Sequence, residues 1–79
     1  MKVIFFAQSR QIAGCADFTL DVNDPLTAPE FWARLIGTFP GLAALEKGAR
    51  LARNETYLRA GDLLQPGDEI AVIPPVSGG

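Results

Sequence analysis

The sequence predicts an α+β fold, with a mixed β-sheet, one main helix on one face and an extended C-terminal tail. Two strongly apolar short segments lie at opposite ends of the chain, at residues 3–7 and 69–73, and the main helical pattern lies between them. A crossover that contains a helix usually joins parallel strands. We therefore expect the two terminal segments to pair in parallel in the middle of the sheet, flanked by antiparallel partners.

The first predicted element is a strand at residues 3–7, a continuous run of β-branched and aromatic residues. Such a run is typical of a strand that is buried on both faces. The polar residues that follow end it, and residues 8–16 are predicted to form a wide hairpin connection. Within this connection Gly14 can supply a turn, and Ile12 is predicted to point inward.

A second strand and the main helix follow. Residues 17–22 alternate polar and apolar, which predicts a strand with one solvated face. Thr27 stands three residues before Glu30, a capping-box spacing, and Pro29 falls in the first turn, where a missing N–H costs nothing. A short extra turn is predicted at residues 42–45. The apolar stripe of the helix comprises Phe31, Trp32, Leu35, Ile36 and Phe39, and its spacing is typical of core packing.

The last third of the chain is predicted to contain only strands and turns. Residues 51–53 and 56–58 are predicted to be short strands around a two-residue turn. Pro66 and Gly67 occupy the two central positions of a predicted type II turn. The apolar run at residues 69–73 is a strong strand candidate, and the prolines behind it end it.

The order of these elements is that of a β-grasp fold. One helix covers only one face of the sheet, yet side chains of adjacent strand residues point to opposite faces. Apolar side chains of residues 3–7 and 70–73 are therefore expected on the uncovered face, with Phe6 as a candidate partner-binding residue. Such an exposed patch on a small domain usually marks a partner site, and partial cover by a loop is the alternative.

Composition excludes several classes of function. The chain has 79 residues, no histidine and one cysteine, which argues against zinc sites, iron–sulfur clusters and disulfide frameworks, so no metal site is predicted. The net charge of −2, with scattered basic residues, predicts no nucleic-acid binding. No apolar stretch is long enough for a membrane span, and no signal peptide is recognisable, so we expect a cytoplasmic protein without membrane contact.

The C-terminal tail is the segment most suggestive of chemistry. We expect one β-grasp domain at residues 1–73 and an extended tail at residues 74–79. The tail has no charged side chain and consists of Pro74, Pro75, Val76, Ser77, Gly78 and Gly79. Prolines stiffen its base and glycines leave its tip without side chains, so it can thread a bare backbone into another protein's pocket. A flexible, inert end is the alternative interpretation.

The ending PPVSGG, preceded by PGDEIA, resembles the small subunit of molybdopterin synthase, the MoaD-type sulfur carriers. The opening residues 5–7, with Arg10 and Gly14 behind them, are similar to the same family. One departure is Arg53, at a position where the family usually has a more apolar stretch. The resemblance implies a ubiquitin-like fold and a carrier that is not itself catalytic. It also implies that the reactive group is the Gly79 carboxylate, which would be adenylated and then converted to a thiocarboxylate.

The resemblance also implies a set of partners. A large synthase subunit would supply the catalytic side chains, in an assembly of two small and two large subunits. An ATP-dependent adenylating enzyme and a sulfurtransferase would load the sulfur, so that ATP is used by a partner and the carrier binds no cofactor. The sulfur would pass to a cyclic pyranopterin phosphate in molybdenum cofactor biosynthesis. Phe6 and the residues Pro74, Pro75, Val76, Ser77 and Gly78 would contact partners.

Three alternatives remain open on the sequence alone: a ubiquitin-like modifier joined to lysines through Gly79, a sulfur carrier for thiamine synthesis, and a plain interaction module with an inert tail. Cys15 is interpreted as a small loop residue, because no histidine or basic cluster is present to activate its thiol. The charges of Asp68 and Glu69 fit either a partner surface or a solvated turn.

Overall fold

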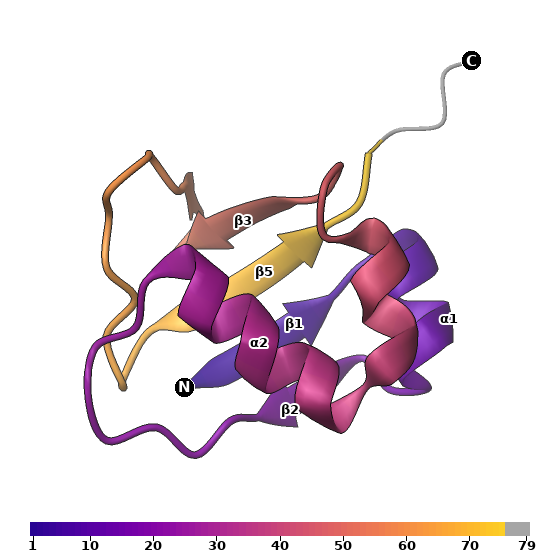
Figure 1. The fold of residues 1–79 in the computed structure, drawn as a ribbon, viewed down its shortest axis with the longest axis horizontal. Helices are drawn as coiled ribbons and strands as arrows, with labels where there is room; N and C mark the ends of the chain where they lie inside the picture. Colours follow the sequence, from indigo (N-terminus) through magenta and orange to yellow (C-terminus); the bar gives the residue numbers. More distant parts are fainter. Residues whose placement is uncertain (76–79) are drawn as a thin grey trace.

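Five strands form one mixed sheet in the computed structural model, which describes residues 1–75 (Figure 1). Along the chain the elements are β1 (Lys2–Phe5), α1 (Ala7–Ala13), β2 (Asp17–Thr19), α2 (Ala28–Thr38), the 3₁₀-helix η1 (Pro40–Leu45), β3 (Arg50–Arg53), β4 (Thr56–Tyr57) and β5 (Glu69–Ile73). The strand order is β2-β1-β5-β3-β4, with β1 and β5 parallel and the other pairs antiparallel. The predicted α+β sheet with a parallel central pair is confirmed.

Helix α2 covers one face of this sheet (Figure 1). It begins as its sequence predicts. The Thr27 hydroxyl accepts a hydrogen bond from the Glu30 N–H at 3.2 Å, and the Glu30 carboxylate accepts one from the Thr27 N–H at 2.9 Å. These bonds satisfy two backbone donors that the first turn leaves unpaired. They also hold the pKa of the Glu30 carboxyl below its usual value, mainly through the backbone N–H of Thr27.

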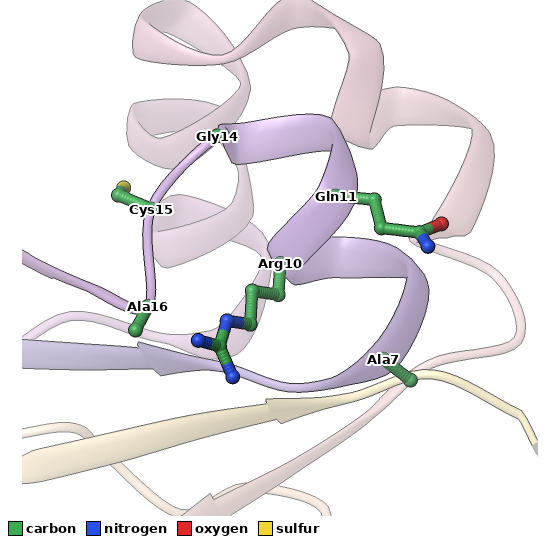
Figure 2. A pocket seen from close by; sticks show the side chains of 6 residues that line it. All are labelled: Ala7, Arg10, Gln11, Gly14, Cys15 and Ala16. Carbon is green, nitrogen blue, oxygen red and sulfur yellow. The ribbon is translucent and has the colours of Figure 1, made fainter.

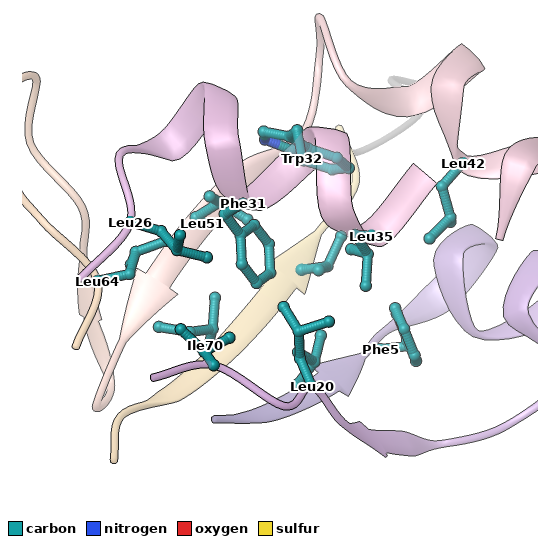
Figure 3. Packing of buried hydrophobic residues seen from close by; sticks show 13 residues of the cluster. Phe5, Leu20, Leu26, Phe31, Trp32, Leu35, Leu42, Leu51, Leu64 and Ile70 are labelled. Atoms are coloured by element: carbon teal, nitrogen blue, oxygen red, sulfur yellow. The ribbon is translucent and has the colours of Figure 1, made fainter. Parts of the chain in front are cut away.

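The hydrophobic core lies between α2 and the sheet (Figure 3). From α2 it receives Phe31, Trp32 and Leu35, all at most 5% exposed, while the sheet supplies the inward side chains of its central strands. Ile36 and Phe39 pack against the edge of this core and are only partly buried. The apolar stripe of the predicted helix is therefore core, as expected from its spacing. The remaining core residues are Val3, Phe5, Leu20, Val22, Leu26, Leu42, Leu51, Leu64, Ile70 and Val72.

Strand β1 differs from its prediction, because it is buried on one face only. Val3 and Phe5 are 0% and 2% exposed, but Ile4 is half-buried and Phe6 is 49% exposed. The continuous apolar run suggested two buried faces, which is wrong here because α2 is the only long helix among the described residues and it covers one face. The strand also ends at Phe5, and Ala7 already belongs to α1.

The connection between β1 and β2 contains a helix that the sequence did not predict. Residues 7–13 form α1, and Gly14 ends it with φ 76°, donating its N–H to the Arg10 carbonyl at 3.0 Å. Ile12 was predicted to point inward, and this is wrong, because its side chain is 41% exposed. It packs toward η1, where a Cβ on Gly41 would stand only 2.8 Å from Ile12 Cγ2. This close approach lets α1 and η1 lie against each other.

Strand β2 is shorter than its prediction: it ends at Thr19 instead of residue 22, although Leu20 and Val22 are still buried in the core. The remaining elements follow the predictions, with one difference in turn type. The turn between β3 and β4 places Asn54 and Glu55 at φ 49° and 72°. The Asp68 N–H donates to the Gln65 carbonyl at 3.0 Å, which closes the predicted turn before β5. Gly67 has no positive φ, so the turn is not type II. A proline at the first central position suits a type I turn equally well.

Arg53, the departure from the family pattern, ties the loop before β5 to the sheet. Its guanidinium donates to the Leu63 carbonyl at 2.6 Å and lies 3.7 Å from the Asp62 carboxylate. Both contacts of Arg53 are local, between β3 and the loop before β5. Within residues 1–75 no helix is long and apolar enough to cross a membrane.

Candidate functional site

The sheet face opposite α2 carries a shallow groove of about 350 Å³. We call it the open face, defined by Ile4, Phe6, Ala52, Tyr57, Ala71 and Ile73 together with two acidic rim residues, Glu55 and Glu69. Phe6 and Tyr57 are each 49% exposed and are the largest exposed apolar side chains on it. The predicted apolar patch on the uncovered sheet face is thus confirmed, and it is not covered by any described loop.

The open face joins the two parallel central strands, since Ile4 of β1 is paired with Ala71 of β5. Tyr57 extends it to the sheet edge, where it is paired with Ala52 of β3. The guanidinium of Arg50 lies over the Tyr57 ring, 3.8 Å from its centroid. This cation–π contact restricts the ring while leaving half of it accessible. Sequence reasoning missed Tyr57, because its place on this face depends on the β3–β4 register.

Phe6 is held at the junction of β1 and α1. Its N–H donates to the Ser9 hydroxyl at 3.0 Å and approaches the Val72 carbonyl at 3.3 Å. The next residue, Ala7, has φ 51°, a left-handed conformation that is unfavourable for alanine. The chain therefore turns sharply after Phe6 and leaves its ring on the open face. Ser9 is fully buried and was not predicted, because its hydroxyl matters only through these tertiary contacts.

The base of the predicted tail follows directly from the open face. Ile73 is the last residue of β5 and lines the groove, Pro74 is buried, and Pro75 is exposed. Pro75 runs beside Gly48, where a Cβ would meet the proline Cγ at 3.2 Å. Of the predicted tail residues, Val76, Ser77, Gly78 and Gly79 lie outside the described residues.

A second hollow, of about 620 Å³, lies beside α1 and is lined by Arg10 and Cys15 among others (Figure 2). Their side chains point in different directions from the helix and the loop after it. Cys15 is a free, partly exposed thiol in a loop, in line with its interpretation as a loop residue. Within residues 1–75 no three His, Cys, Asp or Glu side chains gather in a way that could hold a metal ion. Nothing in this hollow therefore indicates chemistry.

The two acidic residues at the start of β5, Asp68 and Glu69, differ in their surroundings. The Asp68 carboxylate accepts hydrogen bonds from the Gln65 N–H at 2.8 Å and from the Asn54 side-chain amide at 3.1 Å. It braces the turn that leads into β5. Glu69 lies at the rim of the groove instead, so a partner that contacts the groove would meet its charge.

A mixed five-stranded sheet with one covering helix and an open apolar face defines a ubiquitin-like β-grasp protein. The chain belongs to the ThiS family, whose model matches residues 3–79. It is 40% identical over 82 residues to the molybdopterin synthase sulfur carrier subunit of Homo sapiens, covering 100% of this chain and 93% of that protein.

Solved structures place the same fold in two functional settings. Small archaeal modifier protein 1 from Haloferax volcanii matches with a TM-score of 0.84 and 29% identity, covering 100% of this chain and 98% of that one. A chain from the complex of subunits 1 and 2 of the molybdopterin-converting factor of Helicobacter pylori matches with a TM-score of 0.66 and 26% identity, covering 99% and 96%.

Proposed function

We propose that the chain is the sulfur carrier subunit of a molybdopterin synthase. The observation that carries this proposal is the continuity of the open face with the tail: β5 crosses the middle of the face and ends at Ile73, directly before the Pro74 to Gly79 segment. A partner that covers the face is therefore placed to receive the tail. The similarity to the human sulfur carrier subunit extends over the whole chain, including this segment.

The reactive group is the Gly79 carboxylate. A carboxylate resists nucleophilic attack, so an ATP-dependent adenylating enzyme first joins it to AMP and releases pyrophosphate. A sulfurtransferase persulfide then attacks the acyl carbon: a C–S bond forms, the C–O bond to AMP breaks, and AMP leaves. A thiol cleaves the S–S bond of the resulting acyl disulfide, which releases the thiocarboxylate and leaves a disulfide on the thiol side. The thiocarboxylate sulfur then replaces an oxygen substituent on a carbon of the pyranopterin, and water cleaves the acyl C–S bond and restores the carboxylate. ATP is thus consumed by a partner, and the carrier itself binds no cofactor.

The catalytic side chains belong to the large subunit in this proposal. The carrier has no histidine, and its one cysteine lies in a loop at the β2 end of the sheet. An arm without side chains at its tip fits delivery of a reactive group into a closed site from which water is excluded. Two carriers and two large subunits form the proposed assembly. A thiocarboxylate, like a thiol, persists best in a reducing compartment, which favours the cytoplasm.

The open face is the proposed docking surface for the large subunit. Phe6 and Tyr57 are half-exposed aromatic side chains, and aromatic residues contribute much of the binding energy at protein interfaces. Glu55 and Glu69 lie at the rim of the face, and the Arg50 guanidinium lies over Tyr57, so the border carries charges of both signs. The matching surface of the large subunit is accordingly expected to be apolar at its centre, with basic side chains opposite the two glutamates and an acidic side chain opposite Arg50. Pro75, exposed beside Gly48, continues the contact toward the tail.

Intact mass spectrometry of the chain purified from its native cell tests the proposal. We expect a subpopulation heavier by one oxygen-to-sulfur exchange, located on Gly79 by fragmentation. Cys15→Ala should retain this species, and a chain with one alanine added after Gly79 should lose it. Sulfur found on Cys15 instead, or an extended chain that still supports cofactor synthesis, contradicts the proposal.

A second candidate function is protein modification through Gly79. The 29% identity and TM-score of 0.84 with small archaeal modifier protein 1 favour it. Both functions start from the same activated carboxylate, but they differ in its fate. Isolation of the chain joined to lysine side chains of other proteins supports modification. Reconstituted sulfur transfer to the pyranopterin in the presence of the large subunit supports sulfur carriage.

A further inference from the structure

Ser9 is the one buried polar side chain among residues 1–75, with 0% exposure. Its hydroxyl oxygen accepts the Phe6 N–H at 3.0 Å and lies 2.6 Å from the Phe6 carbonyl oxygen, to which it donates its proton. The Val72 carbonyl oxygen lies 3.4 Å from the same hydroxyl. One side chain thus binds both backbone polar groups of Phe6.

These contacts do more than satisfy a buried hydroxyl. Burial of a polar group is costly unless it is hydrogen-bonded, and an alanine would fit the same space without that cost. The hydroxyl instead fixes the backbone of Phe6 at φ −119° and ψ 150°, immediately before the left-handed Ala7. Since the Cα–Cβ direction follows from the backbone, the ring of Phe6 is held toward the open face.

The same hydroxyl reaches the strand that leads to the tail. The Val72 carbonyl oxygen accepts a hydrogen bond from the Phe6 N–H at 3.3 Å, in addition to its contact with the Ser9 hydroxyl. Its neighbour Ile73 lines the open face and is the last residue before Pro74. Ser9 therefore connects the main aromatic anchor of the face to the end of β5.

We propose that Ser9 is a positioning residue for docking of the large subunit: it preorganises Phe6 and the end of β5 before the partner arrives. This inference rests on the proposed function, because it takes the open face as the docking surface. A backbone that is already ordered loses less conformational freedom on binding. Removal of the hydroxyl should therefore weaken binding about fivefold, the low end of what ordering the backbone of one residue costs.

Binding of the large subunit from the same organism, measured by titration calorimetry, tests the inference in four chains: unaltered, Ser9→Ala, Phe6→Ala and the double variant. If Ser9 acts through Phe6, Ser9→Ala weakens binding about fivefold when Phe6 is present and has little further effect when it is absent. If Ser9→Ala weakens binding equally with Phe6 and with Phe6→Ala, or weakens it in neither, Ser9 does not act through Phe6. Leu64→Val is the matched control, since Leu64 is fully buried but lies away from the open face.

A second measurement needs no partner. Hydrogen exchange of the Phe6 amide should speed up in Ser9→Ala relative to the Phe5 amide, which donates to the Ala16 carbonyl at 2.9 Å. Unchanged exchange at Phe6 overturns the inference. Absence of binding by the unaltered chain overturns the proposed function itself, whereas normal binding with additive losses overturns the role of Ser9 alone.

Discussion

Replacement of Phe6 by alanine is expected to weaken binding to the large subunit about 30-fold. Phe6 is 49% exposed in the free chain. For a side chain of roughly 200 Å², about 100 Å² is thus available to a partner, of which alanine would retain about a fifth. At about 25 cal/mol per Å², the lost burial corresponds to about 2 kcal/mol. Each 1.4 kcal/mol is about tenfold in affinity, which gives the expected factor.

The assay is calorimetric titration of the large subunit, well below the thermal midpoint of each variant. Leu63→Ala is the matched control, because Leu63 is 43% exposed and does not line the open face. It should bind within about twofold of the unaltered chain, the range usual for a residue outside an interface. Phe6→Ala binding as tightly as Leu63→Ala would refute the assignment of the open face as the docking surface.

Three further predictions concern the base of the tail, the backbone of Ala7 and the carboxyl group of Glu30. Gly48→Ala places a methyl 3.2 Å from Pro75 Cγ and should slow sulfur transfer severalfold in a reconstituted synthase, with an unchanged circular dichroism spectrum. Ala7→Gly removes the strain of φ 51°, so the free energy of unfolding measured in urea should be equal or higher. Ala33→Gly, at a solvent-exposed position in the middle of α2, should instead lower it by about 1 kcal/mol. Glu30 has a lowered pKa, so its stabilising contribution is complete above the unfolded value near 4.5 and is lost as the pH falls through the folded value. Glu30→Gln should therefore flatten the decrease of stability below about pH 4.5, and an unchanged acid slope would contradict this.

The elements that the sequence predicted well are those with local signals at both ends. Helix α2 has its capping box at Thr27, and strand β5 begins after the turn at Pro66 and ends before Pro74. The parallel pairing of β1 with β5 followed from their composition and the helix between them. In each case the information is contained in neighbouring residues or in a general rule of chain connection.

Helix α1 was missed because its support is not local. Seven residues make fewer than two turns, too few for a periodic apolar pattern to be recognised. The helix is held instead by the buried hydroxyl of Ser9 and by the close approach of Ile12 to Gly41. The only local signal was Gly14, which was read as a turn and is the left-handed residue that ends the helix. Ser9 and Tyr57 were missed at the site for the same reason.

In the proposed function the open face serves recognition and the tail serves chemistry, and this separation has a kinetic consequence. Phe6 and Tyr57 are proposed partner contacts that lie on the sheet, whereas Gly79 carries the proposed reacting atoms. A substitution on the face weakens assembly equally in the ground state and the transition state, so it raises the carrier concentration needed for half-maximal rate. A change at the tip instead lowers the rate within an assembled complex. Reconstituted transfer at saturating carrier should therefore restore the rate of Phe6→Ala but not that of a chain lacking Gly79. A saturated rate that stays low for Phe6→Ala would mean that the face also places the tail in the reaction site.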